Sequence, residues 1–164
     1  MDKVLIYGYG NPDRQDDGVA WYILSELAVR LGREPFSLNS DPFSFAEQSP
    51  HLGVALQLTP EISELLADYD RVCFVDAHTG AVPDDLSIRS IRPEFQTSPF
   101  THHLTPEACL HLTQAITTHT PQAILVSVRG YEFGFDTSLS QATRMLANRA
   151  VEFIWEWTQR SAQI

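Results

Sequence analysis

Aspartate and histidine side chains at three places in the sequence could together perform metal-dependent or acid–base chemistry. Carboxylate oxygens combined with a neutral imidazole nitrogen suit a borderline divalent metal such as nickel or zinc. A carboxylate in the same position could instead act as a general base toward water. The three groups are the acidic pair Asp16-Asp17, the segment from Asp76 to His78, and the pair His102-His103.

Each of these groups also has an ordinary structural explanation. A carboxylate of Asp16 or Asp17 could cap the helix expected to begin near Gly18, which is worth about 0.5–2 kcal/mol. Only one of two neighbouring side chains can reach that helix end, so the other points elsewhere, into a crevice or into solvent. Asp76 could equally cap the turn that follows its strand. The residue types by themselves leave both explanations open.

Other chemistries are disfavoured by what the chain lacks. Lys3 is the only lysine, which argues against a Schiff-base lysine and a phosphate-binding Walker lysine. Gly8-Tyr9-Gly10 begins like a dinucleotide-binding loop, but Asp13 stands at the third glycine position, and the acidic pair after it would repel a pyrophosphate. There is no G-x-S-x-G elbow, and neither Cys73 nor Cys109 follows a strand-to-helix elbow.

The composition points to one globular domain over residues 1–164, with a formal net charge of −10. A surface this acidic repels phosphate backbones and anionic lipids, so nucleic acid and membranes are not expected partners. Two widely separated cysteines do not form a disulfide framework, which fits a reducing compartment. Val4–Tyr7 is too short for a signal-peptide core, so a cytoplasmic location is expected.

Strands and helices are expected to alternate along the chain. Apolar runs predict strands at Val4–Tyr7, Gly53–Leu58, Val72–Asp76 and Ala123–Val128, with an edge strand at Leu86–Ile91. Helical periodicity and Thr-Pro-Glu start signals predict helices over Gly18–Leu31, Thr59–Asp68, Thr105–Thr118 and Ser140–Arg160. This order predicts an α/β fold, a three-layer sandwich with a mostly parallel central sheet of about five strands and helices on both faces.

In such a fold, ligands gather at the carboxyl ends of the parallel strands. The loop from Gly8 to Asp17, the strand end at Asp76 and the loop from Ser98 to His103 are all expected at that edge. We therefore expect the three polar groups to lie near one another. Arg129, Tyr131 and Phe133 are further candidates there, for the wall of a peptide groove.

Three segments resemble the motifs of the hydrogenase maturation proteases, in order and over nearly the whole chain. The opening VLIYGYGNPDRQDDGVAWYILSEL contains a strand, Gly8-Tyr9-Gly10-Asn11 and then Asp16-Asp17-Gly18. VCFVDA is an apolar strand that ends in Asp76-Ala77. FTHHLTPEACLHL places a histidine in a loop just before a helix.

The resemblance implies a site, a substrate and an activity. Asp17, Asp76 and His102 match the family's two carboxylates and histidine, so they are the expected catalytic and metal-contacting residues, with His103 and His78 as other candidate histidines. Such enzymes are endopeptidases that remove a C-terminal extension from the large-subunit precursor of a nickel–iron hydrogenase after nickel insertion. The nickel arrives with this protein substrate, so no permanently bound cofactor is expected.

Two alternatives use the same scaffold. One is a peptidase or small-molecule hydrolase with a tightly held zinc ion. The other is a non-catalytic, metal-binding chaperone for hydrogenase assembly. The metal content of the purified protein and a processing assay distinguish them from a maturation protease.

Overall fold

The computed structural model describes residues 2–41, 48–96 and 103–160. Five strands form one sheet in the order β2-β1-β3-β5-β4. The strands are β1 (Val4–Tyr9), β2 (His51–Ala55), β3 (Arg71–His78), β4 (Leu86–Ile91) and β5 (Gln122–Arg129). The helices are the 3₁₀ turn η1 (Gln15–Gly18), α1 (Val19–Arg30), α2 (Ile62–Leu66), α3 (Pro106–Ile116) and α4 (Gln141–Gln159).

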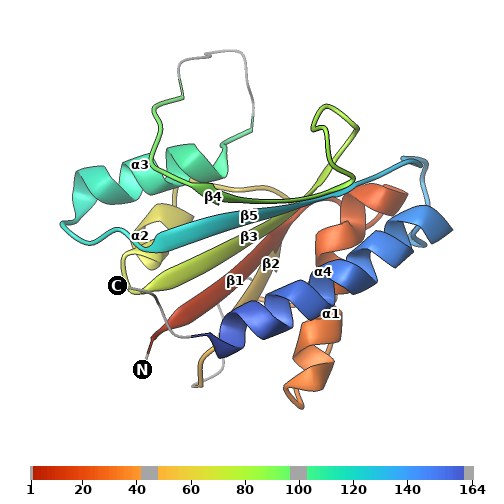
Figure 1. Cartoon of the computed structure of the whole chain (residues 1–164), viewed down its shortest axis with the longest axis horizontal. Coiled ribbons are helices and arrows are strands. Elements are labelled where there is room, and N and C mark those ends of the chain that lie inside the picture. The colour runs from red at the N-terminus through yellow and green to blue at the C-terminus, as the bar shows by residue number, and fades with distance from the viewer. Residues whose placement is uncertain (1, 42–47, 97–102, 161–164) are drawn as a thin grey trace.

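The sheet is mostly parallel and is covered on both faces, as the sequence predicts. The pairs β1–β2, β1–β3 and β3–β5 are parallel, and only the edge strand β4 runs antiparallel to its neighbour β5. Helices α1 and α4 cover one face, and α2 and α3 cover the other (Figure 1). Among the described residues, no helix has the length and apolar character needed to cross a membrane.

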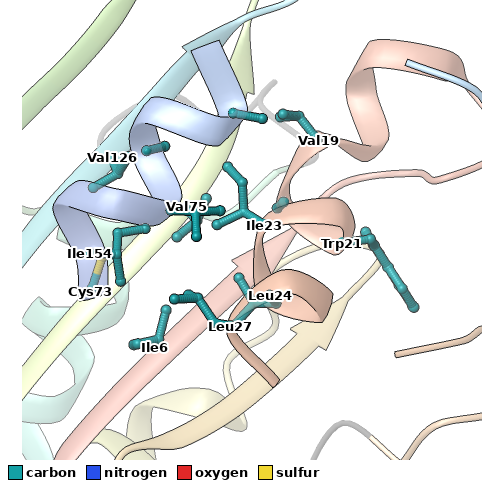
Figure 2. Packing of buried hydrophobic residues seen from close by; sticks show 14 of the residues in the cluster. Ile6, Val19, Trp21, Ile23, Leu24, Leu27, Cys73, Val75, Val126 and Ile154 are labelled. Atoms are coloured by element: carbon teal, nitrogen blue, oxygen red, sulfur yellow. The ribbon is translucent and has the colours of Figure 1, made fainter. Parts of the chain in front are cut away.

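Alternate side chains of the central strands enter two separate cores. Ile6 of β1 and Cys73 and Val75 of β3 pack against α1 and α4, where Ile23 and Ile154 meet them (Figure 2). The residues between them along the strands face α2 and α3. Burial of each such side chain contributes roughly 1.5–3 kcal/mol, so β1 and β3 are fixed at the centre of the fold.

Glycine in β1 allows helix α1 to lie close to the sheet. A Cβ atom on Gly8 would lie 2.9 Å from both Ala20 Cβ and Leu24 Cδ2. This close approach brings the loop between β1 and α1, which contains Asp17, down onto the carboxyl edge of the sheet.

Several expected boundaries differ from the structure. Strand β2 ends at Ala55 rather than Leu58, because its ladder with β1 ends at the pair Tyr9 and Ala55. Helix α2 begins at Ile62, after a turn in which the Ile62 N–H donates to the Thr59 carbonyl, and Thr59 does not cap it. By contrast, the Thr105 side chain caps α3 as predicted and accepts a hydrogen bond from the Ala108 N–H.

Candidate active site

The loop after β1 places Asp17 at the carboxyl edge of the sheet. Gly10 has a φ of +145°, and a Cβ atom there would lie 2.1 Å from the carbonyl oxygen of Asp17, so this position requires glycine. The Oδ2 atom of Asp17 accepts a 2.9 Å hydrogen bond from the Asn11 N–H. Within the part of the chain that the structure describes, Oδ1 of Asp17 has no hydrogen-bond partner, which leaves it able to bind a ligand.

Asp76 lies near the end of β3 at the same edge, and hydroxyl groups contact both of its oxygens. Ser127, its register partner in β5, donates a 2.6 Å hydrogen bond to Oδ1. The Tyr9 hydroxyl donates a 2.9 Å hydrogen bond to Oδ2. Burial raises the pKa of Asp76 above its ordinary value, although these two hydrogen bonds oppose the shift. The side chain is therefore fixed in position and closer to protonation than an exposed aspartate.

Asp17 and Asp76 line one cleft of about 220 Å³, here called the carboxylate cleft. Leu56, Leu58 and Leu104 supply apolar walls, and His103 also lines it. A second hollow of about 390 Å³ shares Asp17 and His103 with the carboxylate cleft and extends it toward Arg14 and Phe133. The two hollows therefore adjoin along these shared residues.

The candidate histidines have different surroundings. His102 lies outside the described residues, so its predicted role remains a prediction. His103 is exposed and lines both hollows. His78 instead contacts the loop after β3, since its Nδ1 accepts from the Gly80 N–H and its Nε2 lies 3.0 Å from the Asp84 carbonyl oxygen. Within the described ranges, no group of three or more His, Cys, Asp or Glu residues is arranged to hold a metal ion by itself.

Asp16 has a role that the sequence did not reveal. Its side chain is fully buried and accepts hydrogen bonds from the backbone N–H groups of Tyr131, Glu132 and Ser140 and from the hydroxyls of Ser140 and Thr143. Burial alone would raise the pKa of Asp16, but these hydrogen bonds together lower it. Of the two explanations that the sequence left open, the helix cap does not occur, because neither η1 nor α1 has a side-chain cap.

The residues just before Asp17 thus hold the loop that follows β5. The Arg14 guanidinium donates twice to the Phe133 carbonyl, and Gln15 accepts from the Gly134 N–H. These contacts, with those of Asp16, fix one wall of the second hollow. Phe133 lines that wall as expected, whereas Arg129 and Tyr131 stack on each other outside the residues that line it.

The cysteines are not candidate nucleophiles. Burial raises the pKa of both thiols, that of Cys109 to about 12. Both side chains lie in the cores: Cys73 packs on the side of α1 and α4, and Cys109 points from α3 into the core on the opposite face. Because a thiolate is the reactive form of cysteine, neither thiol is prepared for attack.

The fold matches those of solved hydrogenase maturation proteases. The TM-score is 0.64 with NiFe hydrogenase maturation protease HycI from Thermococcus kodakarensis KOD1, at 18% identity over 97% of this chain and 94% of that chain. It is 0.65 with the hydrogenase maturating endopeptidase HybD from E. coli, at 16% identity over 96% and 92%. No protein-family model and no curated protein sequence matches the chain. At these identities the similarity establishes a shared fold, as the sequence motifs predicted.

Proposed function

We propose that this chain is an endopeptidase that removes the C-terminal extension from the large-subunit precursor of a nickel–iron hydrogenase. The observation that carries the proposal is that Asp17 and Asp76, the two carboxylates expected from the family motifs, line one cleft. They do so at the edge where this architecture places ligands. The fold shared with named hydrogenase maturation proteases supports the same activity.

Nickel belongs to the substrate in this proposal. Asp17, Asp76 and His102 would complete the coordination of the nickel ion that the precursor carries into the carboxylate cleft. Each carboxylate oxygen has two lone-pair sites, so the hydrogen bonds to Asp76 leave acceptor capacity on both of its oxygens. A mixed set of two carboxylates and an imidazole suits nickel. His103 is the alternative histidine, because it lines the cleft.

Placement of the scissile peptide beside these groups would account for hydrolysis. The oxygen of a water molecule attacks the scissile carbonyl carbon, and a carboxylate of the cleft accepts the proton that the water loses. The C–N bond then breaks, and the leaving amine takes the proton that the carboxylate accepted. Binding of the substrate ion fixes the distance between carbonyl and carboxylate, so recognition and catalysis depend on the same residues.

A processing assay tests the proposal directly. The purified chain is incubated with a nickel-loaded large-subunit precursor, and mass spectrometry measures whether the precursor loses its C-terminal segment. Nickel-free precursor is the first control, and we expect it to remain uncut. Binding of the loaded precursor without shortening would support a chaperone instead, and stoichiometric zinc in the purified chain would support the zinc hydrolase.

A further inference from the structure

A cleft of about 590 Å³ lies at the edge of the sheet opposite to the candidate active site. It is formed by the first residues of β3 and β5, the end of β4 and the end of α4. Three arginines line it, Arg71, Arg92 and Arg160, and we call it the arginine cleft. Arg71 and Asp76 lie five residues apart in β3, which separates the two sites by roughly 16 Å along the strand.

The charge of the arginine cleft is opposite to that of the molecule. The chain has a formal net charge of −10 and 11 basic residues in total. Three of those residues line this one cleft, and none of the described residues that line it is acidic, although Asp2 forms an ion pair with Arg71 from outside the lining. Cationic groups gathered in a concave surface concentrate their field there, so an anion is attracted to this cleft.

Arg71 is held in a fixed position at the base of the arginine cleft. Only 5% of the residue is exposed, and its guanidinium lies 4.6 Å from the centre of the Trp157 ring. Its Nε donates to Asp2 at 3.2 Å, and one terminal nitrogen donates to the Trp157 carbonyl at 3.0 Å. The other terminal nitrogen has no partner within the described part of the chain, which leaves N–H groups for a ligand.

Arg92 and Arg160 add exposed positive charge. Arg92 has no ion-pair or hydrogen-bond partner among residues 2–41, 48–96 and 103–160. Arg160 makes only a 3.9 Å contact with Glu156, and both of those side chains are more than two-thirds exposed. An exposed ion pair at that distance contributes little to stability, so Arg160 can leave Glu156 and bind a ligand with little loss of free energy.

We propose that the arginine cleft binds a small organic anion with a phosphate or carboxylate head and an apolar body. Guanidinium groups match the planar geometry of these oxyanions and bind them through paired hydrogen bonds. Ile124 and Trp157 give the cleft an apolar wall for the rest of the ligand, and its volume is in the usual range for small-molecule sites. This site is separate from the proposed processing site.

Titration of the full-length chain with three matched probes tests this site. Phenyl phosphate and benzoate supply the two head groups on the same ring, and benzyl alcohol supplies the ring without a charge. Binding is followed by the ¹⁵N–¹H resonances of Gln122, Ala123 and the Trp157 indole, which line the cleft. We expect saturable shifts with the anions, weaker binding at higher salt, and little response to the alcohol.

Two double variants locate the binding. Arg92→Gln with Arg160→Gln removes both exposed charges of the arginine cleft, and we expect an affinity loss of about tenfold or more. Arg144→Gln with Arg149→Gln makes the same charge change on exposed side chains elsewhere on α4 and should retain binding. Equal losses in both variants, equal binding of the alcohol, or no saturable shift with either anion would overturn the proposal. The relative affinities of phenyl phosphate and benzoate identify the preferred head group.

Discussion

Ser127 donates a 2.6 Å hydrogen bond to Oδ1 of Asp76 from the neighbouring strand, and the two residues are register partners in the sheet. Together with Tyr9, this contact fixes the Asp76 carboxylate at the floor of the carboxylate cleft. Burial nevertheless raises the pKa of Asp76. A charged group kept in such surroundings costs stability, which is typical of a residue retained for function.

Replacement of Asp76 by asparagine is therefore expected to reduce activity without reducing stability. The new amide side chain would have the same shape, could accept from one hydroxyl and donate to the other, and would carry no buried charge. We expect processing to fall by about 100-fold or more, while the free energy of unfolding at pH 7 is unchanged or higher. The two measurements are the precursor assay and urea unfolding.

The difference in stability between the Asp76→Asn variant and the native chain should depend on pH in one direction. Because the folded-state pKa of Asp76 is raised, its favourable contribution to stability is present below the unfolded-state pKa. That contribution is lost as the pH rises through the folded-state value. Any stability advantage of the Asp76→Asn variant should thus be largest near pH 7 and should disappear on acidification. A variant that is less stable than the native chain at pH 7 would contradict this account.

Removal of the Tyr9 hydroxyl is expected to move the pH profile of processing. The hydrogen bond from Tyr9 lowers the pKa of Asp76, so Tyr9→Phe should raise it further. If the ionised carboxylate is the active form, the acidic limb of the rate profile shifts to higher pH, with a greater loss at pH 6 than at pH 8. Tyr131→Phe removes a hydroxyl that does not contact Asp76 and should leave the limb in place. Equal pH profiles for the Tyr9→Phe and Tyr131→Phe variants would show that Tyr9 does not control the pKa of Asp76.

The strands at the centre of the fold could be predicted because their apolar runs are long and end abruptly. Leu86–Ile91 was predicted with its observed bounds, and the expected strand at Val72–Asp76 falls within β3. Helix starts were less certain, because Thr59 and Thr105 precede the same Pro-Glu pair but only Thr105 caps a helix. The difference depends on the turn before α2, which no local sequence pattern indicates.

The site was predictable as a set of residue types, but its supporting contacts were not. Asp17 and Asp76 follow strands and belong to recognisable motifs, so their meeting at one edge could be inferred. Ser127 contacts Asp76 from 51 residues away, and Thr143 contacts Asp16 from 127 residues away. Such pairs depend on strand order and register, which a single sequence does not specify. For the same reason, the separate roles of Asp16 and Asp17 emerged only from the fold.

Asp17→Asn is expected to abolish processing and leave the fold intact. The Asn11 N–H can still donate to the amide oxygen, so the loop keeps its one contact with this side chain. The loss of charge removes a ligand for the substrate ion, and the rate should fall by about 100-fold or more. Asp13→Asn is the matched control, because Asp13 is exposed in the same loop and does not line the carboxylate cleft. Full processing by the Asp17→Asn variant would show that Asp17 does not belong to the active site.

The two adjacent histidines can be separated by single replacements. The motif order favours His102, and we expect His102→Ala to reduce processing by about 100-fold or more. His103 lines the cleft and is exposed, so His103→Ala is expected to weaken precursor binding and to change the turnover rate less. Steady-state assays with loaded precursor measure both parameters. The opposite pattern would transfer the ligand role to His103.

Asp16→Asn is expected to destabilise the protein most at neutral pH. An amide group would turn a donor toward N–H and O–H groups that now donate to the carboxylate, at a cost of about 3 kcal/mol. Because the pKa of Asp16 is lowered in the folded state, its contribution is present above the unfolded-state pKa and is lost as the pH falls through the folded-state value. Urea unfolding from pH 7 to pH 3 should show the deficit of the variant shrinking on acidification. Asp136→Asn changes an exposed aspartate in the loop after β5 and should cause a much smaller loss. A deficit of the Asp16→Asn variant that does not change with pH would contradict the role of the Asp16 charge.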